Sequence, residues 1–214
     1  MSTPIPGDAE EVRSVRFVCQ HCSAVITCRD DEGGASVPCG DCSRLADAPL
    51  HRCSSGALIG DFLIKELIGE GGMGQVFLAE QRSLKRAVAL KILRQDFAES
   101  PRQLERFLNE ARLAASMNHP NLIAVFGVGE ENDLHYIAME YVRGPSVMDV
   151  LRERKMIPLV EACRIVMDTA AGLQAAWDKR GIVHCDIKPE NILLPQEGGV
   201  KIADMGLAEG LATV

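Results

Sequence analysis

Short apolar runs separated by polar residues dominate the middle of the chain. The segments 62–68, 75–80 and 86–93 each have the length and the apolar content of a β-strand. Two further runs of the same kind cover 122–126 and 135–140. The pattern therefore predicts five strands in this part of the chain.

Apolar positions recur at helical spacing in two longer segments. The first runs from about 101 to 117 after Ser100, a suitable N-cap, and Gln103 completes the pattern of a capping box. The second begins after Pro158 and includes Cys163 in its apolar stripe, so we expect this thiol in a core. Helices and strands together indicate a mixed α+β chain.

A glycine-rich loop separates the first two predicted strands and reads Gly-Glu-Gly-Gly-Met-Gly over residues 69–74. A P-loop would need Lys and then Ser or Thr after the last glycine, but Gln75 and Val76 stand there. A Rossmann turn would open a helix at once, whereas strand-like segments follow. What remains is a glycine hairpin over a nucleotide, because residues without side chains let backbone N–H groups approach phosphate closely.

Glu110 falls at the edge of the apolar face of the first predicted helix. A carboxylate at such a border needs a partner. Lys91, on the preceding predicted strand, is the candidate, and a solvated acid at the helix edge is the alternative.

Charged and amide side chains gather in two short loops near the end of the sequence. Asp186, Lys188 and Asn191 lie in the first loop, and Asp204 lies in the second. Mg²⁺ prefers oxygen ligands and is often shared between carboxylates and substrate phosphates. Two carboxylates, an amide and an ammonium therefore suit a metal-bound phosphate ligand.

Six of the eight cysteines lie in the first 53 residues. Four of them form two Cys-x-x-Cys pairs separated by 16 residues, namely Cys19 with Cys22 and Cys39 with Cys42. This is the spacing of a four-thiolate Zn²⁺ site. A segment this short cannot build an adequate apolar core, and a metal would supply on the order of 10 kcal/mol of folding energy. Two disulfides, or reduced loop cysteines without a role, are the alternative.

Composition and charge narrow the class of partner. The chain has 214 residues, is 47% apolar and carries a net charge of −7, which argues against nucleic acid as the main partner. No apolar run is long enough to span a bilayer, and the polar, acidic N-terminus lacks the features of a signal peptide. We therefore expect a cytoplasmic protein with no membrane segment.

From about Ile59 to Val214 the chain resembles a eukaryotic-type serine/threonine protein kinase, in the form common in bacteria. The motifs that carry the resemblance, in chain order, are Gly69/Gly71/Gly74, Val-Ala-Leu-Lys91, Glu110, Met139-Glu140-Tyr141-Val142, His184-x-Asp186 with Asn191, and Asp204-x-Gly206. The Lys188-Pro189-Glu190 stretch favours Ser or Thr over Tyr as the acceptor in this family.

The resemblance implies an α+β, protein kinase-like fold preceded by a small zinc ribbon. A small N-lobe would hold an antiparallel sheet and one long helix, and a partial C-lobe would be helical. The expected divisions are a disordered N-terminus at 1–16, the ribbon at 17–45, a linker at 46–58, the N-lobe at 59–142 and the partial C-lobe at 143–214.

The resemblance also implies a role for each polar residue. Lys91 would bind the α- and β-phosphates of ATP and pair with Glu110. Asp186 would accept the proton of the substrate hydroxyl, and Lys188 would neutralise charge on the transferred phosphoryl group.

An ATP pocket and a metal pair are implied in the same way. Asn191 and Asp204 would hold Mg²⁺ or Mn²⁺. The backbone of Glu140 and Val142 would contact adenine, with Met139 behind it. The ATP-binding set implied by the family is Ile68, Gly69, Glu70, Gly71, Gly72, Met73, Gly74, Val76, Ala89, Lys91, Met139, Glu140, Val142 and Leu193.

Three features depart from the family pattern. Cys185 stands where many kinases have an Arg that pairs with an activation-loop phosphate, so either activity does not depend on that phosphate or the substitution is tolerated. Met205 replaces Phe. The sequence stops at Val214, so we expect a C-terminally truncated domain whose second long helix exposes apolar surface.

Two functions follow from these observations. The first is ATP-dependent transfer of phosphate to Ser or Thr of a protein, with a structural Zn²⁺ in the ribbon. The alternative is a truncated, non-catalytic pseudokinase or adaptor that binds nucleotide and uses the ribbon as an interaction module.

Overall fold

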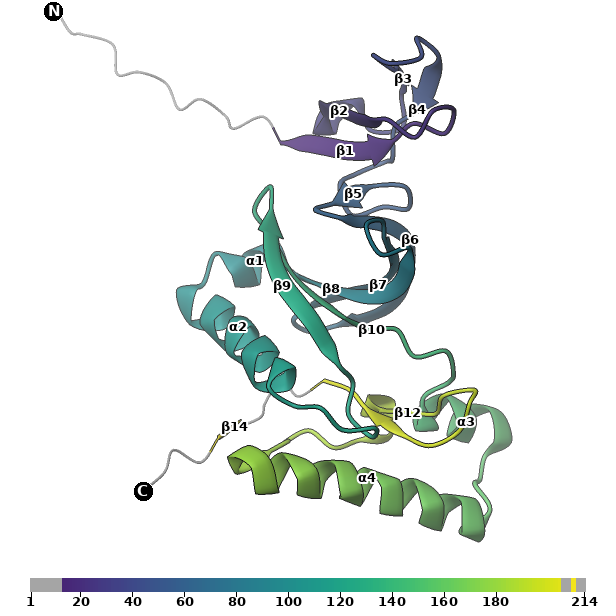
Figure 1. The fold of residues 1–214 in the computed structure, drawn as a ribbon, viewed down its shortest axis with the longest axis vertical. Helices are drawn as coiled ribbons and strands as arrows, with labels where there is room; N and C mark the ends of the chain where they lie inside the picture. The colour runs from purple at the N-terminus through teal and green to yellow at the C-terminus, as the bar shows by residue number, and fades with distance from the viewer. Residues whose placement is uncertain (1–12, 205–208, 211–214) are drawn as a thin grey trace, which may run out of the picture. The chain divides into compact units, whose positions relative to one another are not determined.

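Figure 1 shows the computed structural model, which describes residues 13–204 and 209–210. Residues 1–12 of the expected disordered N-terminus, and Met205 and Gly206 of the last motif, lie outside the described residues.

The chain groups into two compact units. The first comprises Met1–Glu66 and Glu80–Lys85, and the second comprises Leu67–Ala79 and Arg86–Val214. The first strands of the segment that resembles a kinase therefore group with the cysteine-rich segment in this division.

Two small hairpins form the cysteine-rich segment. β1 (Ser14–Val18) pairs antiparallel with β2 (Val25–Arg29), and β3 (Ser36–Pro38) pairs antiparallel with β4 (Leu45–Asp47). These strands extend beyond the expected ribbon of 17–45 at both ends, because Ser14 already pairs with Arg29 across the first hairpin.

Each hairpin turns with the same backbone pattern. The N–H of Ser23 donates to the carbonyl of Cys19 at 2.9 Å, and the N–H of Ser43 donates to the carbonyl of Cys39 at 2.9 Å. Both serines have positive φ, 65° and 60°. Each turn thereby brings the two cysteines of one pair to the end of its hairpin.

A six-stranded sheet has the order β5-β6-β7-β8-β10-β9. Its strands are β5 (Leu58–Ile59), β6 (Phe62–Gly71), β7 (Gly74–Gln81), β8 (Arg86–Leu93), β9 (Val125–Glu131) and β10 (Leu134–Glu140). β10 pairs antiparallel with both β8 and β9. Four of the five predicted strands are therefore present close to their expected bounds.

The strand predicted at 122–126 is mostly wrong, because β9 begins only at Val125. Leu122 instead forms a parallel bridge with Ile202, and the N–H of Ile123 donates to the carbonyl of Ile202 at 3.0 Å. The backbone of this segment is thus satisfied by a strand far along the sequence, which local periodicity cannot report.

The described helices are α1 (Gln95–Ala98), α2 (Pro101–Ala115), α3 (Val147–Arg154) and α4 (Leu159–Arg180). α2 and α4 are the two predicted long helices. Ser100 is the N-cap of α2 as expected, but its side chain makes no capping hydrogen bond, so the predicted capping box is wrong. None of the helices in the described part of the chain is both long and apolar enough to cross a bilayer.

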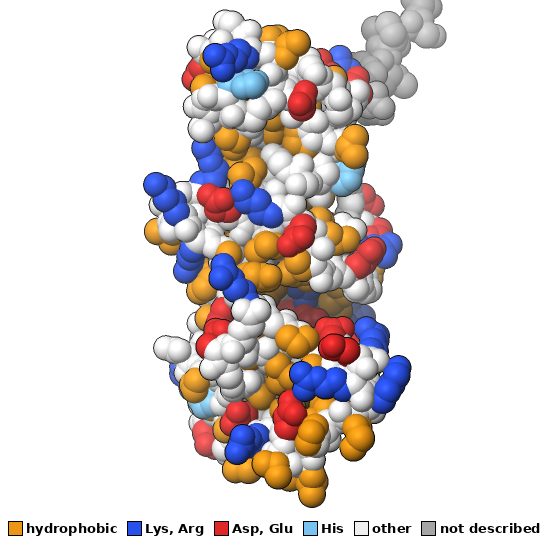
Figure 2. Space-filling model, turned by 90° about the vertical axis from the view of Figure 1, so that its right-hand side faces the viewer, with side chains coloured by type: hydrophobic (Ala, Val, Ile, Leu, Met, Phe, Trp, Pro, Cys, Tyr) orange, Lys and Arg blue, Asp and Glu red, His pale blue; other side chains and the backbone are white. Residues whose placement is uncertain are grey.

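α4 is buried on one side only. Ile165 and Ala176 are 8% and 1% exposed, whereas Val166 and Met167 are 66% and 69% exposed. Cys163 is also exposed, so its expected place in a core is wrong: the apolar stripe is wider than the face that packs. In Figure 2 apolar side chains gather at the level that α4 occupies in Figure 1.

Short strands and 3-10 turns complete the fold. They are a 3-10 turn at Asp30–Glu32, β11 (Ile182–Val183), a 3-10 turn at Pro189–Asn191, β12 (Ile192–Leu193), β13 (Lys201–Ile202) and β14 (Glu209–Gly210). β11 pairs with β14, and β12 pairs with β13. Asn191 precedes β12 and Asp204 follows β13. The β12–β13 hairpin therefore brings both expected metal ligands to one place.

Candidate active site

A cavity of about 680 Å³ is lined by the glycine hairpin, the end of β10 and the loops that flank β12 and β13. The expected ATP-binding residues all line it, as do Asp186, Lys188, Asn191 and Asp204. Glu110 does not. It lines a smaller cavity of about 30 Å³, to which Lys91 and Asp204 also contribute.

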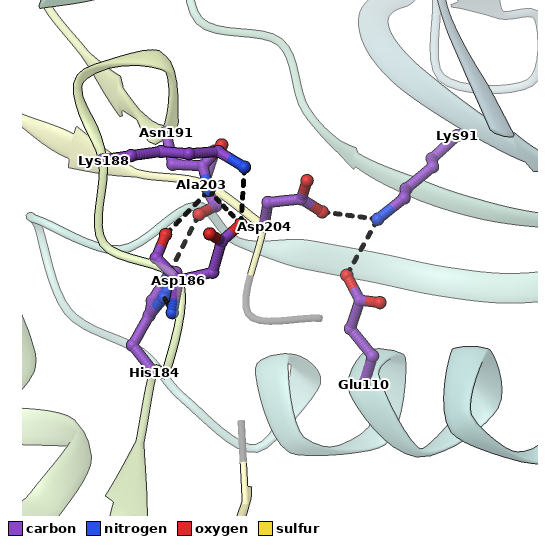
Figure 3. A network of polar contacts seen from close by, with 8 residues as sticks. All are labelled: Lys91, Glu110, His184, Asp186, Lys188, Asn191, Ala203 and Asp204. Carbon is purple, nitrogen blue, oxygen red and sulfur yellow. Dashed lines mark hydrogen bonds and ion pairs between the residues drawn. The ribbon is translucent and has the colours of Figure 1, made fainter. Parts of the chain in front are cut away.

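Lys91 joins two carboxylates from distant elements (Figure 3). Its side chain on β8 is 10% exposed, and its Nζ lies 3.0 Å from Oε1 of Glu110 on α2, so the expected ion pair is present. Nζ also contacts Oδ1 of Asp204. Burial by itself lowers the pKa of Lys91, but the carboxylates of Asp204 and Glu110 more than reverse this effect and hold the ammonium charged.

The two carboxylates around Lys91 respond differently to their surroundings. Burial raises the pKa of Glu110, and the attraction of Lys91 offsets this only in part. Desolvation also raises the pKa of Asp204, but Lys91 outweighs it, and the pKa lies below its ordinary value. The Asp204 side chain is 45% exposed, so its carboxylate is ionised and open to the cavity.

A second group of contacts fixes the loop around Asp186 (Figure 3). Nζ of Lys188 lies 2.7 Å from Oδ2 of Asp186, and Nδ2 of Asn191 donates to the same oxygen at 3.1 Å. The hydrogen bond from Lys188 lowers the pKa of Asp186, and the same bond raises the pKa of Lys188. Asp186 is therefore a carboxylate, held in place by a cation and an amide.

His184 ties this loop to the end of β13. Its Nε2 lies 3.1 Å from the carbonyl of Ala203, and the N–H of Asp186 donates to its Nδ1 at 3.3 Å. The ring is 3% exposed. Because Ala203 adjoins Asp204, this histidine fixes the spacing between the two carboxylates of the site. The neighbouring Cys185 is exposed.

The end of β10 is fixed by the side chain of Glu140. Its Oε2 lies 2.9 Å from Nζ of Lys201 on β13 and accepts a hydrogen bond from the N–H of Ala124 at 3.1 Å. The carboxylate of Glu140 thus anchors the end of β10 to β13 and to the backbone at Ala124.

Sequence reasoning missed several residues that line the cavity, among them Ser146 and Asp149. The two form a reciprocal cap at the start of α3: the N–H of Ser146 donates to Oδ2 of Asp149 at 3.0 Å, and the N–H of Asp149 donates to Oγ of Ser146 at 3.1 Å. The hydroxyl of Ser146 lowers the pKa of Asp149. The Ser-x-x-Asp spacing was the signal that could have identified this cap.

The donor set around the β12–β13 hairpin suits a hard divalent cation. Asp204 presents a carboxylate and Asn191 an amide, and oxygen ligands of this kind bind Mg²⁺ in company with substrate phosphates. The amide nitrogen of Asn191 is engaged with Asp186, at 2.9 Å to its carbonyl, which leaves the amide oxygen for a ligand.

The four cysteines of the ribbon converge. Their sulfurs all lie within 4.8 Å of one another, with 3.8 Å between Cys19 and Cys42 and 3.6 Å between Cys22 and Cys39. Tetrahedral coordination with Zn–S bonds of about 2.3 Å separates the sulfurs by about 3.8 Å, so the cluster has the size of a zinc site.

The pKa values of Cys19 and Cys22 are shifted in opposite directions. The N–H of His21 lowers the pKa of Cys19 to about 6. A backbone hydrogen bond from Ala24 lowers the pKa of Cys22, but desolvation and the neighbouring sulfurs raise it to about 12. A negative charge on one sulfur thus disfavours ionisation of the neighbouring thiol, and a cation bound among the sulfurs would offset this repulsion.

Comparison with known proteins gives consistent results for the second part of the chain. The model of the protein kinase domain family matches residues 62–213. A probable serine/threonine-protein kinase of Clostridium perfringens is 39% identical over 157 residues, which are 73% of this chain and 23% of that protein. PrkC of Bacillus subtilis is 40% identical over 154 residues, 72% of this chain and 24% of that protein. The chain spans about a quarter of the length of these curated relatives.

Solved structures show the same fold. The crystal structure of the PknI kinase domain of Mycobacterium tuberculosis superposes with a TM-score of 0.64 at 29% identity, over 73% of this chain and 64% of that one. The similarity confirms the fold expected from the motifs.

Proposed function

The chain belongs to the protein kinase family, and from this premise we propose that it transfers the γ-phosphoryl group of MgATP to a serine or threonine hydroxyl of a protein. The observation that carries the proposal is the convergence of Lys91, Asp186, Lys188, Asn191 and Asp204 on one cavity beside the glycine hairpin. We place this activity in the cytoplasm, where ATP is available and thiols stay reduced.

The cavity divides into a base end and a phosphate end. At the base end, Val76, Ala89 and Leu193 supply apolar contact, and the backbone after Met139 supplies hydrogen bonds for adenine. At the phosphate end, the ion pair with Glu110 fixes the position of the Lys91 ammonium, which would contact the phosphates. In this family such catalysis is almost entirely positioning and electrostatic stabilisation.

Asn191 and Asp204 are the residues that would hold Mg²⁺. The ion would supply positive charge that offsets the negative charge of the phosphate groups during transfer. The low pKa of Asp204 keeps this ligand ionised at neutral pH.

Asp186 orients the acceptor hydroxyl and receives its proton. The hydrogen bond from Lys188 lowers the pKa of Asp186, and catalysis in this family is almost entirely positioning and electrostatic stabilisation, so we assign orientation as its main contribution. Lys188, 2.7 Å from Asp186, lies where it can offset charge on the group in transit.

Transfer of radiolabelled phosphate from ATP to a generic basic protein tests the proposal. Asp186→Asn should abolish the transfer, whereas the matched change Asp133→Asn, in the exposed turn between β9 and β10, should leave it intact. Equal transfer by both variants would refute the role of Asp186. Thermal stability provides the second readout, since MgATP at about 100 times its dissociation constant should add about 2.7 kcal/mol. Stabilisation without transfer would favour the non-catalytic adaptor.

We also propose that Cys19, Cys22, Cys39 and Cys42 bind one structural Zn²⁺. Metal analysis of freshly purified, reduced protein should find about one zinc per chain. Cys39→Ser should lose it and Cys163→Ser, at an exposed position on α4, should keep it. Zinc-free wild-type protein with a folded ribbon would contradict this assignment.

A further inference from the structure

Strand β1 connects the cysteine cluster with the first strands of the sheet, inside the first compact unit. Val15, Phe17 and Cys19 alternate along one face of this strand and its end, and they are 0%, 1% and 1% exposed. Phe17 forms an antiparallel bridge with Ala57, the residue before β5. The strand that leads directly into Cys19, a proposed metal ligand, therefore also pairs with the entry to the sheet.

The turn between β7 and β8 makes a second connection in the same unit. Nη2 of Arg82 donates to the carbonyl of Ser23 at 3.4 Å, and Ser23 adjoins Cys22. The backbone N–H of Arg82 donates to the carbonyl of Asp61, between β5 and β6, at 2.9 Å. One residue thus contacts both the first cysteine turn and the β5–β6 hairpin.

The β5–β6 hairpin is small and closely packed at this point. The N–H of Ile64 donates to the carbonyl of Ala57 at 2.9 Å, and the N–H of Gly56 donates to the carbonyl of Ile64 at 2.9 Å. Ala57, Ile59 and Ile64 are each at most 1% exposed. β5 itself has only two residues and stands at one end of the sheet order, so its pairing to β6 supplies little stability of its own.

The cysteine-rich segment cannot supply that stability by apolar burial alone. Its buried cluster consists of eight residues, three of which are cysteines. A core of this size is too small to stabilise a fold by itself. Because the four thiolates come together only in the folded segment, the free energy of metal binding adds to the free energy of folding.

Resting on the zinc site proposed above, we propose that the metal bound by the four cysteines stabilises the described part of the first unit, residues 13–66 and 80–85, so that the edge of the sheet at 57–66 and the turn at 80–85 lose their order when the metal leaves. The ribbon is then a metal-dependent brace for the start of the sheet, rather than a module tethered beside it. β1, which Phe17 anchors in the buried cluster of the ribbon, transmits the effect through the backbone bridge from Phe17 to Ala57, and Arg82 transmits it through its two hydrogen bonds.

Hydrogen exchange followed by mass spectrometry tests this proposal directly on the purified chain. Removing zinc with a chelator should accelerate exchange at the amides of Ile64 and Arg82 by about tenfold or more, the change that corresponds to about 1.4 kcal/mol of local stability. Peptides from α2 and β10, which belong to the second unit, should keep their protection. No step of this test measures phosphoryl transfer, so it is independent of the proposed kinase activity.

Variants separate the brace from the metal site itself. Phe17→Ala and Arg82→Ala retain all four cysteines, so they should still bind zinc, while peptides covering 57–66 exchange faster even with the metal present. Cys163→Ser serves as the control and should behave as wild type.

Three results would overturn the proposal. Chelation could accelerate exchange only within residues 14–48, which would make the ribbon an independent module. It could accelerate α2 and β10 equally, which would make the metal a stabiliser of the entire chain. Reduced protein could also bind no zinc at all.

Discussion

Replacing Lys91 by Met should destabilise the protein by far more than a typical loss of a salt bridge. Glu110 is 8% exposed, and within the described residues its Oε2 already has no hydrogen-bond partner. Without the ammonium, the buried carboxylate loses its ion-pair partner and faces the carboxylate of Asp204. Breaking a buried pair in this way costs about 3–5 kcal/mol, because it leaves an uncompensated charge.

Arg94→Met is the matched control for this substitution. Arg94 and Asp96 lie 2.9 Å apart, almost the same separation as Lys91 and Glu110, but their side chains are 53% and 57% exposed. An exposed pair of this kind contributes about 0–1 kcal/mol. Urea unfolding can be followed by the fluorescence of Trp177, the only tryptophan of the sequence, which lies in the same compact unit.

The loss should also depend on pH. Burial raises the pKa of Glu110, and removing Lys91 raises it further. A carboxyl group whose pKa is raised by folding favours the folded state at low pH, and this stability is lost as the pH rises through the folded-state pKa. Lys91→Met should therefore cost less at about pH 5 than at about pH 8. Equal losses for the two variants, or a loss for Lys91→Met that is independent of pH, would refute the reasoning.

Three further changes have outcomes that the structure specifies. Gly144→Ala should unfold the chain at a lower temperature, because φ is +157° there and a Cβ would lie 1.9 Å from the carbonyl oxygen of Leu194; an unchanged Tm in a thermal melt would contradict this. Lys201→Met should lower the free energy of unfolding by about 1–3 kcal/mol in urea titrations, since it leaves the half-buried carboxylate of Glu140 without its cation, and charge-neutral Glu140→Gln in the same background should recover part of the loss. Cys163 should react with a maleimide in the folded, zinc-loaded protein, as judged by mass mapping of the labelled peptide, which separates it from the exposed Cys185, and protection until unfolding would show that Cys163 is covered.

Local pattern predicted those parts of the site that depend on nearest neighbours in sequence. The cysteine spacing identified both turns of the ribbon, because a Cys-x-x-Cys turn is closed by a bond from Ser23 to Cys19 only four residues away. Glu110 was recognised as needing a partner from its position at the border of a helical face. Lys91 was then the nearest cation on the preceding strand, and the two atoms lie 3.0 Å apart.

Features that depend on contacts between distant segments were not predictable in this way. Glu140 pairs with Lys201 across 61 residues, and no local signal marks either side chain. Leu122 looked like part of a strand because it is apolar, yet its backbone pairs with Ile202. Cys163 shares the apolar stripe of α4, but periodicity alone does not tell which part of a wide stripe is packed.

The β12–β13 hairpin fixes the distance between Asn191 and Asp204. Two residue pairs, Ile192 with Ile202 and Leu193 with Lys201, set the distance between the ligands at its ends, together with the hydrogen bond from the N–H of Ala203 to the carbonyl of Asn191. The turn that closes the hairpin includes the exposed glycines Gly198 and Gly199, and it lies at the opposite end from the two ligands. A fluorescent reporter inserted at that turn should leave the distance between Asn191 and Asp204 unchanged. A shift of one residue in the strand pairing would instead turn every side chain of the strand to the opposite face.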